Sequence, residues 1–390
     1  MKAGWQIRPL GEICDFEGGS QPPKSQFIYE EKFGYVRFLQ IRDFASEKNI
    51  TYIPISKKNR ICNEGDILIG RYGASVGKIL TSRAGAYNVA LMKTIPNFDL
   101  LEKSWFYHYL VSNEFQSQLL NVASRSAQDG FSKDDIYNFP VPVPPRPEQQ
   151  RLVKILDESF ENIVAAKTNA AKNLQNARAL FESHLQSVFT HCGEGWKQKT
   201  LEEIAITFGR GKSRHRPRNE PKLYGGEYPF IQTGDIRNSD HFITEYSQTY
   251  SEAGLAQSKL WPRGTICITI AANIAETGIL GFDSCFPDSV IGVVANPDEA
   301  DVDYVEYLLQ SFKVRIQAMG KGSAQANINM GTFENERFPF PIVSEQKQIV
   351  CKLNSLREET RRLESIYEQK IDALAALEKS LHDQAFNGQL

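Results

Sequence analysis

Positively charged side chains gather in one short segment that glycine and proline flank. No acidic residue lies among the cations of residues 210–218, which are Arg210, Lys212, Arg214, Arg216 and Arg218. Guanidinium and ammonium groups of this kind contact the phosphates of nucleic acids. A solvated surface loop is the usual alternative for a run of charge. The whole chain has a formal net charge of −2, so the local concentration of positive charge favours a phosphate-contacting edge.

A second group of polar residues lies in a glycine-rich segment, residues 70–79, directly after a strand expected at residues 66–69. Glycine allows a backbone to approach a ligand, and the polar side chains can reach base edges or phosphates. A tight turn with surface charges is the alternative. In the corresponding segment of the second half, Asn273 replaces arginine, an exchange that can move preference from guanine to adenine. The candidates in the first half are Arg71, Tyr72, Ser75 and Lys78.

Two small polar loops share the sequence Ser-Ala-Gln, although the segments around them differ. Each follows a predicted helix, and the first of these helices is expected near residues 104–122. A surface loop without a function has no need to repeat these residues, so we interpret both loops as contacting bases or the nucleic-acid backbone. The candidates are Arg125, Ser126, Gln128, Lys321, Ser323, Gln325 and Asn327.

The sequence lacks the residue patterns that would support chemistry by this chain alone. Residues 209–213 end like a nucleotide-binding loop, but Ile206 stands where that motif requires glycine. The histidines and cysteines do not have metal-ligand spacing. No nucleophile elbow, H-E-x-x-H, N-P-P-[FY] or S-adenosylmethionine fingerprint is present. The chain is therefore predicted to have no catalytic site, no metal and no cofactor of its own.

Two long helices organise the chain around these candidates. Apolar residues recur at alternating steps of three and four in both segments, as in a narrow helix seam. A helix of about 45 residues extends about 65 Å. A break near residues 165–171 is the alternative for the first helix, and its alanine content argues against a break. The predicted seam residues are Leu152, Leu156, Ile163, Leu180, Ile349, Leu353, Leu356, Leu363, Tyr367, Leu374, Leu377 and Leu381.

The chain is an internal duplication. Gly195-Trp196 repeats Gly4-Trp5, and two proline-rich exits precede the Glu-Gln pairs at the start of each long helix. The ends of the two blocks match well and the interiors poorly, as expected for two related modules with different targets. The predicted domains are 1–145 and 191–342, each followed by a long helix at 146–190 and 343–390.

Composition places the chain among ordinary globular proteins. It has 390 residues, of which 41% are hydrophobic and 24% charged. The six cysteines are scattered and form no C-x-x-C pair, so their spacing argues against a disulfide scaffold and against a zinc site. This cysteine usage favours a location in the reducing cytoplasm. No apolar run is long enough to cross a bilayer.

The ordered recurrence of these motifs resembles the specificity subunits of type I restriction–modification enzymes. The similarity covers nearly the whole chain and includes the Gly-Trp starts, the Ser-Ala-Gln loops, the proline exits and the C-terminal Ala-Phe-Asn-Gly-Gln-Leu. It also includes the strands that end in Gln40 and Gln232. We add both glutamines and the nearby Arg42 to the candidates for DNA contact.

The resemblance implies an α+β protein. Two α/β target recognition domains in a pseudo-twofold arrangement would be joined by two long antiparallel helices that act as a coiled-coil spacer. Each recognition domain would read one half of a bipartite double-stranded DNA site. The implied partners are two DNA adenine methyltransferase subunits that use S-adenosylmethionine. Motor-nuclease subunits that use ATP and magnesium would join the full complex.

Three other interpretations compete with this one. A catalytic methyltransferase or restriction enzyme would need a cofactor fingerprint. A coiled-coil scaffold without a DNA function would not bind DNA in a sequence-selective manner. An orphan specificity subunit would serve only a DNA adenine methyltransferase.

Overall fold

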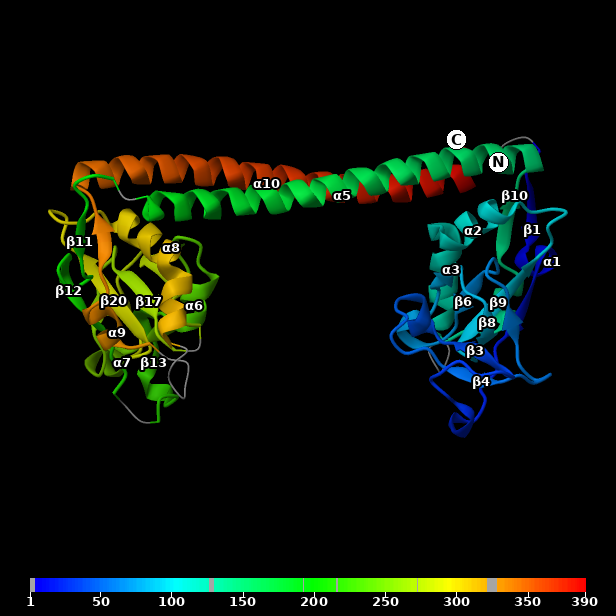
Figure 1. Cartoon of the computed structure of the whole chain (residues 1–390), viewed down its shortest axis with the longest axis horizontal. Coiled ribbons are helices and arrows are strands. Elements are labelled where there is room, and N and C mark those ends of the chain that lie inside the picture. Colours follow the sequence, from blue (N-terminus) through cyan, green and yellow to red (C-terminus); the bar gives the residue numbers. More distant parts are fainter. Residues whose placement is uncertain (1–3, 126–129, 192, 215–216, 272, 321–327) are drawn as a thin grey trace. The chain divides into compact units, whose positions relative to one another are not determined.

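The structure is a computed structural model (Figure 1), which describes residues 4–125, 130–191, 193–214, 217–271, 273–320 and 328–390. It divides into two compact units. Unit 1 contains Met1–Ala171 and Glu368–Leu390, and unit 2 contains Lys172–Tyr367. Both division points fall inside the long helices α5 (Arg146–Thr190) and α10 (Val343–Phe386), so each unit includes a part of both helices. The predicted functional domain boundaries remain predictions.

Unit 1 is built on two four-stranded sheets. The first has the order β2 (Cys14–Gly18), β9 (Leu91–Pro96), β6 (Leu68–Gly70) and β7 (Ile79–Leu80), all antiparallel. The second has the order β4 (Tyr52–Pro54), β3 (Tyr35–Leu39), β8 (Gly85–Tyr87) and β5 (Ile61–Cys62), in which only β3 and β8 are parallel. The proline exit forms β10 (Pro140–Val143), which pairs with β1 (Gln6–Pro9) alone; this edge position suits a strand that contains proline.

The helices of unit 1 are short apart from its segments of α5 and α10. They are α1 (Leu10–Ile13), α2 (Lys103–Val111), α3 (Asn113–Ala123) and α4 (Lys133–Tyr137), with 3-10 turns η1 (Lys24–Gln26), η2 (Ile41–Phe44) and η3 (Gly73–Ser75). The single helix expected over residues 104–122 is wrong. Ser112 separates α2 from α3, because its hydroxyl donates to the Tyr109 carbonyl and caps the start of α3.

Unit 2 repeats this plan with one additional strand. A five-stranded sheet has the order β12 (Ala205–Arg210), β20 (Val290–Ala295), β17 (Ile266–Thr269), β18 (Thr277–Leu280) and β14 (Phe242–Ile243). A four-stranded sheet has the order β15 (Gln248–Tyr250), β13 (Tyr224–Phe230), β19 (Ser284–Cys285) and β16 (Leu260–Trp261). The second proline exit, β21 (Phe338–Phe340), pairs with β11 (Lys197–Lys199).

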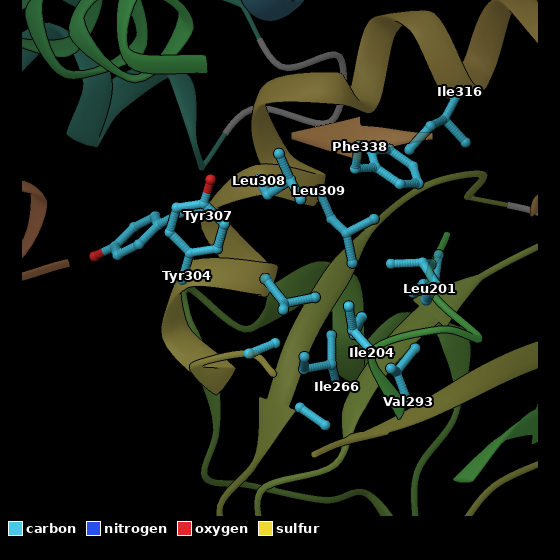
Figure 2. Packing of buried hydrophobic residues seen from close by; sticks show 14 of the residues in the cluster. Leu201, Ile204, Ile266, Val293, Tyr304, Tyr307, Leu308, Leu309, Ile316 and Phe338 are labelled. Atoms are coloured by element: carbon cyan, nitrogen blue, oxygen red, sulfur yellow. The ribbon is translucent and has the colours of Figure 1, made fainter. Parts of the chain in front are cut away.

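The helices of unit 2 include one long element outside α5 and α10, namely α8 (Val302–Gly320). The shorter elements are α6 (Thr233–Asn238), α7 (Glu252–Ala256), α9 (Met330–Glu334) and the 3-10 turn η4 (Pro221–Leu223). Apolar side chains of α8 pack against the sheet, as Figure 2 shows for Leu309, which points toward Ile204 and Ile266.

The last turn of each long helix completes a core. In unit 1, Phe386 of α10 lies 5.6 Å from the ring centroid of Trp105 and 5.8 Å from that of Tyr109. In unit 2, Phe189 of α5 lies 5.4 Å from the ring centroid of Tyr304. Both phenylalanines are buried. Removal of a buried phenylalanine side chain costs about 3–5 kcal/mol, so each helix end is part of the fold it contacts.

Within each unit, α5 and α10 run in opposite directions. In unit 1, Phe160 packs against His382 and Lys167 pairs with Glu378. In unit 2, Arg178 pairs with Glu364 at 3.0 Å. The helix α5 is continuous over 45 residues, so the alternative of a break near residues 165–171 is wrong. No helix among the described residues is long and apolar enough to span a membrane.

Candidate nucleic-acid interface

The glycine-rich segment of unit 1 lies against the loop that follows α3. Arg71 Nε donates a hydrogen bond to the Phe131 carbonyl at 3.3 Å, and Tyr72 forms a β-bridge with Gly130. The Arg71 guanidinium also lies 5.0 Å from the centre of the Tyr72 ring. Two candidate segments far apart in sequence are therefore neighbours in space.

Gly130 is required for this contact. A Cβ atom at this position would lie 2.4 Å from the Tyr72 ring and 2.9 Å from the Arg71 carbonyl oxygen. Lys78, at the end of the glycine-rich segment, is exposed, while Ser75 is half-buried. Arg125 is exposed just before the shared loop. The remaining candidates of the two Ser-Ala-Gln loops lie outside the described residues: Ser126, Gln128, Lys321, Ser323, Gln325 and Asn327.

Gln40 and Gln232 occupy the same structural position in the two units. Each is the residue immediately before a helical turn, and an aspartate three residues later accepts a hydrogen bond from its backbone N–H. The distances are 2.7 Å for Gln40 N to Asp43 Oδ2 and 2.8 Å for Gln232 N to Asp235 Oδ2. This cap orients the glutamine at the end of a strand. Gln232 Nε2 additionally donates to Gln248 Oε1 at 2.8 Å.

Arg42 belongs to a charged cluster that the sequence interpretation missed. Arg42 Nε lies 3.8 Å from Asp43 Oδ1, and Arg37 and Arg83 both contact Glu47. Burial raises the pKa of the Asp43 carboxyl group, and the charges of the three arginines oppose that rise. Arg37 lies on β3 and Arg83 in the loop before β8, so no local pattern in the sequence could have connected them.

The basic segment of unit 2 contains two kinds of arginine. Arg218 makes two hydrogen bonds to the Asp288 carboxylate, at 2.8 and 3.0 Å, and Arg210 Nε donates to the Asp288 carbonyl at 2.7 Å. The sequence interpretation saw no acid in this segment because Asp288 is distant in sequence. Lys212 and Arg214 are exposed and form no ion pair with any residue that the structure describes. Arg216 lies outside the described residues.

Lys259, directly before β16, adds to this positive surface. The Lys259 ammonium group lies 3.6 Å from the centre of the Trp261 ring. Its pKa is lowered, first by partial burial and then by the charge of Lys212. Because Lys259 and Lys212 are close enough to influence one another, they form a site of positive potential that would attract an anion.

Asn273 is positioned by an arginine that the sequence interpretation missed. Arg237 Nη1, on α6, donates to Asn273 Oδ1 at 3.3 Å. The α6 helix begins directly after Gln232, so this bond joins Asn273 to the helix that follows Gln232. Arg237 is exposed. Arg237 lies in a short polar helix, and no sequence motif marked it as a candidate for DNA contact.

The predicted helix seam differs from the structure at three leucines. Leu180 is 50% exposed, Leu363 is 37% exposed and Leu377 is 46% exposed. Ion pairs join the two helices near these positions: Glu364 pairs with Arg178, and Glu378 pairs with Lys167. A straight helix drifts from a strict heptad repeat, and the end of α5 turns its buried side toward the unit 2 core.

The other nine predicted seam residues are buried or half-buried. Leu152, Leu156, Ile163 and Leu353 are buried. The half-buried ones are Ile349, Leu356, Tyr367, Leu374 and Leu381.

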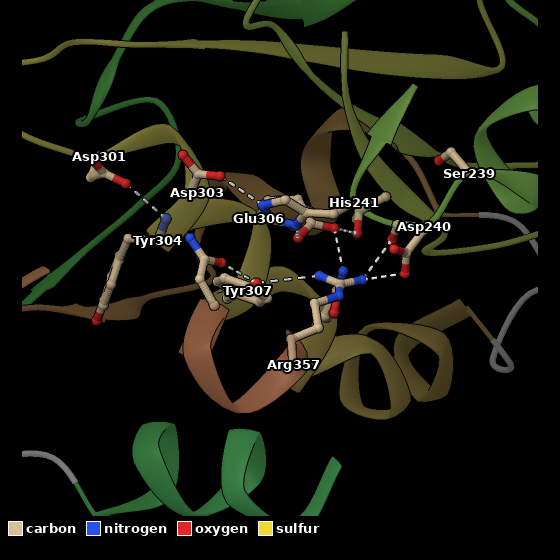
Figure 3. A network of polar contacts seen from close by, with 12 residues as sticks. Ser239, Asp240, His241, Asp301, Asp303, Tyr304, Glu306, Tyr307 and Arg357 are labelled. Carbon is tan, nitrogen blue, oxygen red and sulfur yellow. Dashed lines mark hydrogen bonds and ion pairs between the residues drawn. The ribbon is translucent and has the colours of Figure 1, made fainter. Parts of the chain in front are cut away.

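A buried polar network fixes unit 2 to its segment of α10. His241 bridges Asp303 and Glu306 of α8, through Nε2 at 2.7 Å and Nδ1 at 2.6 Å (Figure 3). Burial lowers the pKa of His241, but its hydrogen bonds to the Asp303 and Glu306 carboxylates outweigh this effect, so the pKa is raised. Arg357 of α10 binds Asp240, the neighbour of His241.

Unit 1 has a different polar junction at the corresponding place. His108 Nε2 lies 2.8 Å from Asp157 Oδ1 on α5, and the ring of His382 lies 5.8 Å from that of His108. Burial, followed by the charge of His108, lowers the pKa of His382 to about 4. No group of three potential metal ligands occurs in the described ranges of the chain.

The sequence model of the type I restriction modification DNA specificity domain matches residues 2–173 and 193–373. The chain belongs to this family. The two matched segments correspond to the two halves of the duplication. This specificity subunit has both copies of the domain, which fits the repeated sheet order of units 1 and 2.

Relatives in sequence share this family over most of their length. The chain is 24% identical to the type I restriction enzyme MjaVIII specificity subunit of Methanocaldococcus jannaschii, covering 90% of this chain and 86% of that protein. It is 18% identical to the EcoKI specificity subunit of Escherichia coli K12, covering 100% and 90%.

Solved structures show the same fold. A chain from a type I R-M system, solved in work on complex assembly and conformational transition, superposes with a TM-score of 0.81 at 19% identity, covering 100% of this chain and 99% of that chain. The HsdS subunit of Thermoanaerobacter tengcongensis gives a TM-score of 0.70 at 20% identity, with coverage of 100% and 98%. The predicted α+β class with two repeated domains and long helices is confirmed.

Proposed function

We propose that this specificity subunit reads a bipartite double-stranded DNA site, with one half-site bound by the recognition domain of each unit. The contact of Arg71 and Tyr72 with the Gly130–Phe131 backbone carries the proposal. It holds the glycine-rich segment against Gly130 and Phe131 in unit 1. Arginine and amide side chains at such a place can bind base edges, and lysines near them can bind phosphates.

Unit 2 supports the proposal through different side chains. Arg237 and Asn273 are hydrogen-bonded there and Gln232 precedes the same helix, whereas Arg71 and Tyr72 stand in the matching segment of unit 1. Amide groups pair well with adenine and arginine pairs well with guanine. The two units would therefore read unlike half-sites, and the DNA site would be asymmetric.

The long helices would set the spacing of the half-sites and bind two DNA adenine methyltransferase subunits. Apolar residues that the chain leaves exposed on these helices support this role. In unit 1 they are Val164 and Leu377, and in unit 2 they are Leu180, Leu363 and Ile366. Exposed apolar residues on a helix provide contact area for a partner.

The chain would contribute recognition and no catalysis. S-adenosylmethionine would be bound by the methyltransferase subunits, and ATP and magnesium by motor-nuclease subunits in the full complex. A cytoplasmic location also remains a prediction. Membership of a DNA specificity family weighs against the coiled-coil scaffold without a DNA function.

Methylome sequencing of the host with and without this gene tests the proposal. We expect one asymmetric motif, made of two short half-sites around a spacer of fixed length, to lose adenine methylation when the gene is deleted. An unchanged methylome, or loss of a single uninterrupted motif, would contradict it. The purified chain with its methyltransferase subunits should also bind the mapped site in a salt-sensitive and sequence-selective manner.

A further inference from the structure

One carboxylate of unit 1, that of Glu47, lies between two arginines. Arg37 Nη1 lies 3.6 Å from Glu47 Oε1, and Arg83 Nη1 contacts the same oxygen. The Glu47 side chain is 57% exposed, so water can solvate its carboxylate if the contact breaks. An ion pair whose carboxylate is this exposed contributes little to stability. Glu47 is therefore easily exchanged for another anion.

Arg37 has hydrogen-bonding capacity that Glu47 does not use. Its Nε and Nη2 atoms are buried and have no hydrogen-bond partner among the described residues. Only 21% of the Arg37 side chain is exposed, because β3 and its neighbours surround it. A buried donor without a partner is costly, so the Glu47 contact leaves the Arg37 guanidinium incompletely satisfied.

The charge around Glu47 also favours a second anion. The buried Asp43 carboxylate lies among Arg42, Arg37 and Arg83, whose charges act on its pKa. Three arginines thus face two carboxylates, Asp43 and Glu47. Asp43 is 2% exposed and caps the turn at Gln40, so it cannot leave without unfolding that turn. Glu47 is the anion that can be displaced.

We propose that Glu47 occupies the site of a DNA backbone phosphate, and that Arg37 and Arg83 bind this phosphate once Glu47 swings into solvent. This inference rests on the proposed DNA-recognition function. A phosphodiester has two free oxygens that can accept from two guanidinium groups. Strand β3, which holds Arg37, leads directly into Gln40 and Arg42. A phosphate held there would place the neighbouring bases near these candidates.

The arginine pair of unit 2 is a useful contrast. Arg218 binds both oxygens of the Asp288 carboxylate, and Arg210 binds the Asp288 backbone carbonyl. A side chain that swings away would not free Arg210, because a carbonyl is fixed in the backbone. Movement of the Asp288 side chain would therefore free Arg218 only, whereas movement of Glu47 would free two guanidinium groups.

DNA binding by the assembled complex with its methyltransferase subunits tests the assignment. Fluorescence anisotropy with a labelled duplex that carries the mapped site would be measured across a salt series. We expect the Glu47→Gln complex to bind the duplex about 3–10-fold more tightly at low salt. The slope of log K against log salt should also become steeper by about 1, because in the wild type the displaced Glu47 carboxylate binds a cation from solution and the glutamine does not. Arg83→Ala should bind more weakly, with a slope shallower by about 1.

The matched control is Glu158→Gln, which makes the same charge change at an exposed position of α5 paired with Lys154. Its affinity and slope should equal those of the wild type. Equal effects of Glu47→Gln and Glu158→Gln, or no effect of Glu47→Gln, would overturn the assignment. A normal slope for Arg83→Ala with a lowered melting temperature would also overturn it, since Arg83 would then be purely structural. Failure of the wild-type complex to select the mapped site would instead reject the proposed function itself.

Discussion

Gln149 and Gln346 make the same set of hydrogen bonds in the two halves of the chain. Gln149 Nε2 donates to the Leu100 and Pro144 carbonyls, and its Oε1 accepts from the Glu102 N–H. Gln346 Nε2 donates to the Glu299 and Pro341 carbonyls, and its Oε1 accepts from the Asp301 N–H. Both glutamines are fully buried. Each one ties the first turn of a long helix to the proline exit and to the start of a domain helix.

Substitution of either glutamine should destabilise its own unit. Gln149→Ala or Gln346→Ala leaves buried backbone groups without partners, at about 1–3 kcal/mol for each group, so we expect a loss of about 3 kcal/mol in the free energy of unfolding. Urea denaturation followed by circular dichroism measures it. The neighbouring Gln150→Ala and Gln348→Ala are exposed controls that should unfold like the wild type. Equal midpoints for Gln149→Ala and Gln150→Ala would show that this buried bonding is unimportant.

Acidification should affect the two units in opposite directions. The pKa of His382 is lowered to about 4, so protonation favours the unfolded state, and unit 1 should lose stability as the pH falls from about 6.5 toward 4. The pKa of His241 is raised, so its contribution to unit 2 is present below pH 6.5 and is lost as the pH rises through the raised value. Hydrogen exchange at pH 5.5 and 7.5 can follow each unit separately.

Two variants test the origin of this pH response. His382→Leu should remove the acid sensitivity of unit 1 without changing unit 2, because an apolar side chain suits the buried place beside Phe160. His241→Gln should abolish the stability that unit 2 gains at low pH. If neither variant changes the pH profile, other titrating groups control it.

Gly130→Ala should separate the two candidate loops of unit 1. The added Cβ would collide with the Tyr72 ring, so the glycine-rich segment and the loop after α3 would move apart. We expect DNA binding at the unit 1 half-site to weaken by about tenfold, the effect of losing one good base contact. Gly234→Ala on α6 has open space around its new Cβ and serves as the control. If Gly130→Ala keeps the wild-type affinity, the contact between Tyr72 and Gly130 is not needed for DNA recognition.

The arginines of the basic segment should differ in their response to salt. Arg214→Ala should make the salt dependence of DNA binding shallower by about 1 in slope, since this exposed arginine has no ion pair with a described residue and can neutralise a phosphate. Arg218→Ala should leave the slope unchanged and lower the thermal stability of unit 2, because Asp288 already holds this side chain. Anisotropy over a salt series measures the first and a melting curve the second. The reverse pattern would assign phosphate binding to Arg218.

Changes in helix length should change the spacer of the recognised site. The helices α5 and α10 have 45 and 44 residues. Insertion of one turn, about four residues, in both helices should alter the number of bases between the half-sites and preserve the half-site sequences. The insertions belong between residues 165–171 and 362–368, away from the domain cores. Methylation mapping that returns the original spacer would reject a spacing role for the helices.

The sequence by itself determined the elements and their repetition. Heptad spacing, alanine content and the Glu-Gln starts predicted two long helices, because helix periodicity is a local property of the chain. The proline exits predicted extended segments for the same reason, since proline fixes its own backbone. The duplication and the family resemblance followed from ordered motifs, which survive even where the interiors diverge.

Only the tertiary structure decided which side chains share a site. Asp288 saturates Arg218, and Glu47 joins Arg37 to Arg83, through contacts between residues that are 70, 10 and 36 positions apart. The contact of Glu364 and Glu378 with the opposite helix could be recognised only from their ion pairs with Arg178 and Lys167. Pairing of distant charges depends on the packing of strands and helices in space, and no local pattern encodes it.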